Sequence, residues 1–302
     1  MCEFKNMTSF LSKIKSIFSV KRFFLGLVAL AVISAAGYQF YVENFTIQKY
    51  INYSDEECIK DERCVWLAFK EIALGREFVP NEISKGGFIF KWSIMKIPEI
   101  VIAIRPEEMI DKFKGMLQYH LDYIEKDTGL KFSLHQGKDD KRLINNIIFF
   151  SDDFDFLIFR KYRKTFRQLS QTGYKDPNHF HNYFRKYHQG VECFALAISG
   201  EKNQDSKDFV FAMQFIKSDM DTIHISHCTA EEFIQSLGLP NDIPGFKATI
   251  FNDESRNRDN ITKLDHLLLQ ILYDDRIKFG MREKDIKPIF HDIYQDKLQN
   301  FN

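Results

Sequence analysis

The stretch from Ser226 to Asn241 constrains the fold most, because it contains both a helix start and a helix stop. Thr229 and Glu232 have the spacing of a capping box, in which a hydroxyl and a carboxylate satisfy backbone N–H groups of the first turn. Gly238 and Pro240 end the helix, since glycine adopts the left-handed conformation and proline does not continue a helix. The sequence therefore predicts a helix of about three turns that begins at Thr229.

Polar side chains gather on one side of this predicted helix and just beyond its end. Glu231 and Gln235 are four residues apart and so share a helix face, and Glu232 lies beside them. Asn241 and Asp242 follow directly after the turn. We expect these five side chains to form the candidate site, with Glu232 as the candidate catalytic residue and the others as binding residues.

The same stretch resembles the active-site helix of metzincin-type zincin metallopeptidases, which reads His-Glu-x-x-His-x-Leu-Gly-Leu and is followed by a third His. In this register Glu231 and Gln235 take the places of the first two zinc ligands, and Asn241 lies near the third. Glu232 keeps the place of the general base, and residues 237–239 match outright. The resemblance implies a zincin-like fold in which the zinc ligands have been replaced.

The likeness continues downstream. Residues 248–253 resemble the Met-turn, with Phe251 in the place of the Met, and residues 261–273 resemble the last metzincin helix. The chain also resembles a bacterial family catalogued as domain of unknown function 2927. The matching residues are Cys228, Glu231 to Asp242, Phe251 to Asp253, Leu272 to Asp274, and Gly280 with Met281.

The order of predicted elements gives an α+β fold class whose upper half is α/β-like: a zincin-like mixed sheet with one long helix and one central helix. Runs rich in β-branched and aromatic residues predict strands at 88–92, 100–104, 130–135, 146–150 and 210–215. Apolar residues at helical spacing predict helices at 66–77, 106–129, 262–273 and 284–298. Thr262 with Asp265 has capping-box spacing at the start of the third of these helices.

The N-terminus predicts export. Residues 1–22 are basic, and residues 23–42 carry no charge over twenty positions, enough for a helix to cross a bilayer with its basic end in the cytoplasm. We expect a single-pass inner-membrane anchor, then a stalk at 43–64 and a periplasmic globular domain at 65–302. The alternative is a signal peptide cleaved near residues 34–36, which would release the protein into the periplasm.

Cysteine usage agrees with an oxidising compartment. Cys58 and Cys64 are close enough in sequence to close a small loop, and Cys193 and Cys228 give the second predicted disulfide. A Cys/His metal site that uses His224 and His227 is the alternative. The pattern places these two histidines on a strand end, where their rings would point to opposite faces.

A helical insertion at 154–190 combines basic residues with aromatic ones. Such a segment covers a buried aromatic stripe with solvated lysine and arginine, or binds an anionic surface such as lipid head groups. Its histidines are His179, His181 and His188. His179 and His181 cannot share a helix face, which argues against a metal site there.

The formal net charge is zero, so no overall field favours nucleic acid. Glu231, Gln235 and Asn241 offer only oxygen ligands, whereas catalytic zinc sites use histidine nitrogen or thiolate with at most one carboxylate among three ligands. Zinc is therefore not favoured, and the metal and cofactor stay unassigned. We expect a domain that has lost zinc and binds an envelope protein or peptide. The alternative is a hydrolase of peptide or cell-wall material with Glu232 as general base.

Overall fold

The protein is described here from a computed structural model, and the chain divides into two compact units, 1–49 and 50–302. The residues that the structure describes are 34, 37–38, 46–75, 87–93, 97–137, 139–161, 191–199, 209–252, 261–299 and 301. The expected membrane segment at 23–42 lies almost entirely outside these residues. Among the described residues, no helix is both long and apolar enough to cross a membrane.

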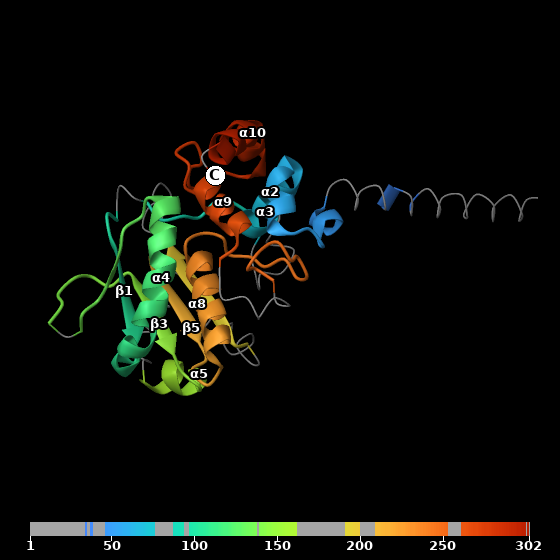
Figure 1. The fold of residues 1–302 in the computed structure, drawn as a ribbon. Coiled ribbons are helices and arrows are strands. Elements are labelled where there is room, and N and C mark those ends of the chain that lie inside the picture. Colours follow the sequence, from blue (N-terminus) through green and yellow to red (C-terminus); the bar gives the residue numbers. More distant parts are fainter. Residues whose placement is uncertain are drawn as a thin grey trace, which may run out of the picture. The chain divides into compact units, whose positions relative to one another are not determined.

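The second unit contains one five-stranded sheet and two groups of helices (Figure 1). A short 3-10 turn, η1 (Ile47–Tyr50), leads into it. The strands are β1 (Ile100–Arg105), β2 (Phe132–Leu134), β3 (Asn146–Phe150), β4 (Cys193–Ser199) and β5 (Phe209–Ile216). The longer helices are α2 (Asp55–Lys60), α3 (Glu62–Leu74), α4 (Ile110–Thr128), α8 (Thr222–Ser236), α9 (Lys263–Leu272) and α10 (Glu283–Gln299). Shorter turns are η2 (Glu107–Met109), α5 (Phe154–Phe156) and η3 (Leu157–Lys161).

The sheet is mixed, with the strand order β2-β1-β3-β5-β4. Strands β2, β1, β3 and β5 run parallel to one another, and β4 pairs antiparallel with β5 at one edge of the sheet. The α+β class is therefore confirmed, as are the strand at β3 and the long helix that ends at Gly129, which has a left-handed φ of 71°.

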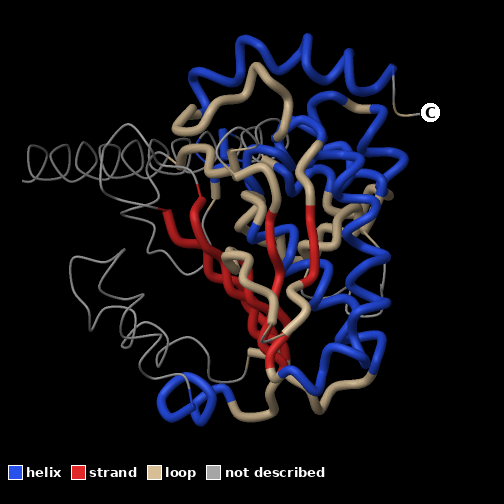
Figure 2. Tube along the Cα trace, turned by 90° about the vertical axis from the view of Figure 1, so that its left-hand side faces the viewer, coloured by secondary structure: helices blue, strands red, loops and turns tan. Residues whose placement is uncertain are grey.

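Helices α4 and α8 lie side by side along one face of the sheet (Figures 1 and 2). The strand register places Phe150, Ile216 and Cys193 opposite one another, so all three point to this face. Phe113 of α4 stacks on Phe150 with ring centroids 4.0 Å apart, and Cys228 of α8 is bonded to Cys193. The two helices are thus attached to the same sheet face.

The opposite face carries an aromatic core. Phe149, Phe194 and Phe215 stack across three strands, with centroid distances of 5.2 and 4.5 Å. Phe154 and Leu157 of the short helical segment α5–η3 join this cluster. Residues 154–161 of the expected basic insertion are therefore helical and pack on the sheet through Phe154 and Leu157. The rest of the insertion, with its histidines, lies outside the described residues.

A second group of helices, α2, α3, α9 and α10, gathers at one end of the sheet (Figure 1). Cys58 and Cys64, both fully buried, form the disulfide that joins α2 to α3. The Tyr294 hydroxyl of α10 donates to the Ile59 carbonyl at 2.7 Å. Most of the segment expected to be a stalk, from Tyr50 onward, therefore belongs to the folded unit.

The predicted strand at 88–92 is wrong. Among the described residues only Phe88 makes an isolated bridge, with Arg282. Trp92 is buried instead as an anchor, because its indole N–H donates to the Ser236 carbonyl at 2.9 Å. This bond attaches the segment 87–93 to the C-terminal end of α8.

Residues 248–252 are held against the start of α9 by a single buried carboxylate. Asp265 accepts hydrogen bonds from the Thr249 hydroxyl, from the Ile250 N–H at 3.0 Å, and from the N–H and hydroxyl of Thr262. The capping box predicted for Thr262 and Asp265 is confirmed. The Asp265 carboxylate also holds residues 249 and 250 in place, a long-range contact that the local sequence did not predict.

Candidate functional site

Helix α8 begins earlier than the sequence pattern predicts. Its N-cap is Asp221, whose carboxylate accepts from the His224 N–H at 3.0 Å. Thr229 is inside the helix, where its hydroxyl donates to the Ile225 carbonyl at 2.7 Å, so the predicted capping box is wrong. His224 and His227 are consequently helical residues and not strand residues.

The acidic side chains of α8 are buried. Every residue of α8 from 227 to 236 is buried, with exposed fractions of 7% for Glu231 and 4% for Glu232. The Nε2 atom of His227 lies 3.4 Å from Glu231 Oε2, one helical turn away. The two acids therefore lie inside the protein instead of on the wall of an open cleft.

The other predicted binding residues make contacts within the chain. Gln235 donates to Asp242 Oδ1 at 2.8 Å across the turn that ends α8. Asn241 points elsewhere, because its amide donates to the Glu71 carbonyl near the end of α3 at 2.9 Å. The structure thus brings Gln235 and Asp242 together and turns Asn241 toward α3, so the predicted convergence of all five side chains is not observed.

A disulfide lies beside the buried acids. Cys193 of β4 and Cys228 of α8 are bonded, with 5.8 Å between their Cα atoms, which confirms the predicted pair. One carboxylate oxygen each of Glu231 and Glu232 lies, with Cys193 Sγ, in a group whose members are all within 4.8 Å of one another. The disulfide and the two acids therefore form one compact cluster between α8 and the edge strand.

Two buried amides on the sheet were missed by sequence reasoning. Asn146 of β3 and Gln214 of β5 are fully buried, and their side-chain nitrogen and oxygen atoms have no hydrogen-bond partner among the described residues. Both share the sheet face of Phe150 and Ile216, which α4 and α8 cover. The available signal was a single amide within an otherwise apolar strand run, as in residues 209–216. Polar groups in such a setting normally have partners.

The zinc implied by the metzincin resemblance does not fit this geometry. In that register the ligands would be Glu231, Gln235 and Asn241, but the Gln235 amide binds Asp242 and the Asn241 amide binds Glu71. Two of the three positions are therefore used to hold the fold. The third, Glu231, offers an oxygen ligand in a buried position.

A separate cavity of about 580 Å³ lies between α3 and the start of α10. Four cationic side chains and two acidic ones are among its described lining residues, so positive charge predominates. Lys70 and Glu283 form an ion pair at 3.6 Å. The described lining residues are Lys70, Glu71, Leu74, Gly75, Gly87, Arg282, Glu283, Lys284 and Lys287.

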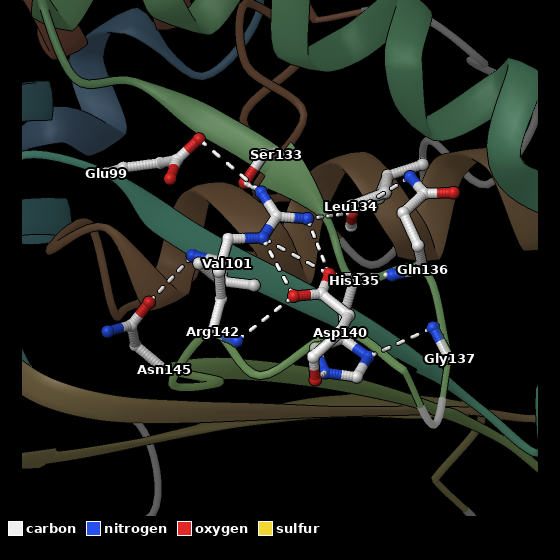
Figure 3. A network of polar contacts seen from close by, with 10 residues as sticks. All are labelled: Glu99, Val101, Ser133, Leu134, His135, Gln136, Gly137, Asp140, Arg142 and Asn145. Atoms are coloured by element: carbon white, nitrogen blue, oxygen red, sulfur yellow. Dashed lines mark hydrogen bonds and ion pairs between the residues drawn. The ribbon is translucent and has the colours of Figure 1, made fainter.

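A further polar network surrounds Arg142 at the other edge of the sheet, but its groups satisfy one another (Figure 3). The guanidinium donates to the Ser133 hydroxyl at 2.7 Å, to the Leu134 carbonyl at 2.8 Å and to the Asp140 carboxylate at 2.6 Å. Arg142 and the backbone N–H of Gln136 hold the pKa of Asp140 well below its usual range. This network closes the loop between β2 and β3 and leaves no reason to assign it a ligand.

Comparison with known proteins gives a family but no characterised relative. No curated protein matches the chain, and no solved structure does. The family described as "Protein of unknown function (DUF2927)" matches residues 65–292, which include β1 to β5, α8, α9 and the first part of α10. The chain therefore belongs to the DUF2927 family of proteins of unknown function.

Proposed function

We propose that this chain is an inner-membrane envelope protein whose periplasmic unit is a binding or assembly module and not a peptidase. The burial of Glu231, Glu232 and Gln235 carries this proposal, with exposed fractions of 7%, 4% and 5%. A peptidase must bring a peptide bond within hydrogen-bond reach of its general base. A base covered on all sides by its own protein is poorly placed for that step.

The order of elements supports a zincin-like ancestry for the unit. A strand, a long helix, further strands and a central helix follow one another as the metzincin resemblance predicts. The replaced ligand positions then hold the turn after α8 and the end of α3 in place. On this proposal the fold has been kept, and the residues at the former metal-ligand positions now make hydrogen bonds that stabilise it.

Export and anchoring rest on the N-terminal sequence and the cysteines. Residues 23–42 carry no charge and follow a basic segment, which favours a single-pass anchor with the following domain in the periplasm. Two disulfides suit an oxidising compartment. The alternative, cleavage near residues 34–36, gives a secreted periplasmic protein with the same folded unit.

The cavity between α3 and α10 is the proposed contact site for an acidic segment of an envelope protein or peptide. Lys284 and Lys287 are exposed at its rim, and Arg282 and Lys70 add further positive charge. Charge complementarity of this kind raises association rates and selects partners. Nucleic acid is not proposed, because the chain as a whole carries no net positive charge.

A fluorescent oligoglutamate peptide tests this contact site. We expect salt-sensitive binding to the full-length chain that is lost in Lys284→Glu/Lys287→Glu. It should survive in Lys112→Glu/Lys114→Glu, which reverses two exposed charges on α4. No binding to the native chain, or equal loss in both variants, contradicts the assignment.

The competing function is a hydrolase of peptide or cell-wall material with Glu232 as general base, supported by the closeness of its carboxylate to that of Glu231. Glu232→Gln separates the two proposals. A binding module predicts no hydrolysis of unfolded casein or peptidoglycan by either chain. Hydrolysis by the native chain that disappears in a folded Glu232→Gln chain would establish the enzyme instead.

A further inference from the structure

The cluster at the β4 side of α8 contains side chains of the types that bind metal ions, two of them joined in a disulfide. Cys193 Sγ lies within 4.8 Å of carboxylate oxygens of Glu231 and Glu232, and Cys228 Sγ is bonded to it. His227 Nε2 lies 3.4 Å from Glu231 Oε2. Two sulfurs and two carboxylates therefore lie together on β4 and one face of α8, and the imidazole lies beside Glu231.

The sheet beneath this cluster contains buried amide side chains at positions that are usually apolar in a protein core. Gln214 pairs with Ala195, two residues along β4 from Cys193, so Gln214 and Cys193 point to the same face. The Gln214 amide is fully buried without a partner among the described residues, and so is the Asn146 amide. Buried amides of this kind normally bind an ion, a water molecule or another polar group.

We propose that reduction of the Cys193–Cys228 disulfide creates a binding site for a thiophilic divalent cation such as Zn²⁺. A dithiol reductant supplies two electrons and two protons, its own sulfurs form a disulfide, and the Cys193–Cys228 bond is replaced by two thiols. The cation then displaces both thiol protons and binds the two thiolates. A carboxylate of Glu231 or Glu232 and the imidazole of His227 complete a four-ligand set.

The chemistry of the donors explains why the disulfide and the cation exclude each other. The thiolate is the metal ligand, and a sulfur in a disulfide does not carry that charge. Zn–S bonds of about 2.3 Å and Zn–O bonds of about 2.1 Å place ligand atoms roughly 3.5 Å apart, which fits Cys193 Sγ and the carboxylate oxygens of Glu231 and Glu232, all within 4.8 Å of one another. Cys193 is only partly buried, whereas Cys228 is buried, so we expect a small reductant to approach the bond from the Cys193 side.

This inference goes beyond the proposed function, and its donors differ from those of a metzincin. Gln235 and Asn241 take no part, and the soft thiolates select zinc-like ions over Ca²⁺ or Mg²⁺. The site would report the redox state of the compartment, because only the reduced protein binds the cation.

Cobalt titration of the full-length chain tests the proposal. The chain carries Cys2→Ser, Cys58→Ser and Cys64→Ser, so that Cys193 and Cys228 are its only thiols. After reduction by a phosphine, we expect one equivalent of Co²⁺ to produce a thiolate-to-cobalt charge-transfer band in the near ultraviolet, and Zn²⁺ to abolish it. The oxidised chain should give no such band.

Matched variants assign the ligands. Cys193→Ser/Cys228→Ser in a Cys2→Ser chain keeps the other cysteine pair and should give no band, and Glu231→Gln/Glu232→Gln should weaken cobalt binding by at least about tenfold. Far-ultraviolet circular dichroism reports whether each chain is folded. The proposal is overturned by a folded, reduced chain without the band, by unfolding on reduction, or by a band that persists in Cys193→Ser/Cys228→Ser.

Discussion

The side-chain amide of Gln235 donates a hydrogen bond to Oδ1 of Asp242, 2.8 Å away, across the turn that ends α8. Gln235 is buried, so the loss of its acceptor leaves a polar group without compensation, which costs about 1–3 kcal/mol. We predict this loss of unfolding free energy for Asp242→Ala, measured by urea denaturation. Asp242→Asn keeps an Oδ1 acceptor and should stay within about 1 kcal/mol of the native chain. Equal losses in both variants would contradict a hydrogen-bonding role.

Gly238 is required by two features of the same turn. Its φ is 118°, and a Cβ atom there would lie 2.0 Å from the Phe90 carbonyl oxygen. We predict that Gly238→Ala costs at least about 2 kcal/mol, because backbone strain adds to a clash with main chain. Gly115→Ala is the control, since it lies in the exposed part of α4 with open space around it and should stabilise by about 0.5–1 kcal/mol.

Asp265 is fully buried and accepts hydrogen bonds from donors of two segments. Asp265→Ala should cost about 3 kcal/mol or more, since it leaves the N–H groups of Ile250 and Thr262 without their acceptor. Asp285 also caps a helix start, at the Arg282 N–H, but it is exposed. Asp285→Ala should therefore cost only about 1 kcal/mol in the same denaturation assay.

Asp274 makes the free energy of unfolding depend on pH in the acid range. Burial alone would raise the pKa of its carboxyl, but hydrogen bonds from Arg276 and Lys297 outweigh burial and hold the pKa below its usual range. The ionised form is thus favoured in the folded state. Its stabilising effect is present above the unfolded pKa of about 3.9 and is lost as the pH falls below that value.

We therefore predict that Asp274→Asn lowers the unfolding free energy at pH 7 by about 1.5–3 kcal/mol and has a smaller effect as the pH falls below about 4. Chemical denaturation across the acid range measures both quantities. Asp292→Asn changes an exposed residue of α10 and should follow the native curve. A constant difference between native and Asp274→Asn chains at every pH would contradict the role of ionisation.

Periodicity predicted the parts of the fold that local sequence determines. The helix at α10 and the strand at β3 needed only apolar spacing, and the start of α9 needed only Thr262 with Asp265. The start of α8 was missed because Thr229 and Glu232 have capping-box spacing, while the true cap at Asp221 precedes residues that resemble a strand. A local pattern does not reveal which of two possible caps the tertiary structure uses.

The candidate site was predicted in composition but not in geometry. The five polar residues were found, and the Cys193–Cys228 pair was confirmed. The burial of the polar residues depends on tertiary packing. The separation of Asn241 from Gln235 depends on the hydrogen bond from Asn241 to Glu71 of α3, which is distant in sequence. Asn146 and Gln214 were missed because an amide in an apolar strand run does not show which sheet face it takes until the strand register is known.

Carboxylate footprinting tests most directly the central claim that the acids of α8 are interior groups. The native full-length chain is treated with a carbodiimide and an amine, and labelling is quantified by mass spectrometry against the denatured chain. We predict that Glu231 and Glu232 are labelled far more slowly in the native chain than when denatured, while exposed Glu108 is labelled at similar rates in both. Native labelling of Glu232 as fast as that of Glu108 would contradict the account.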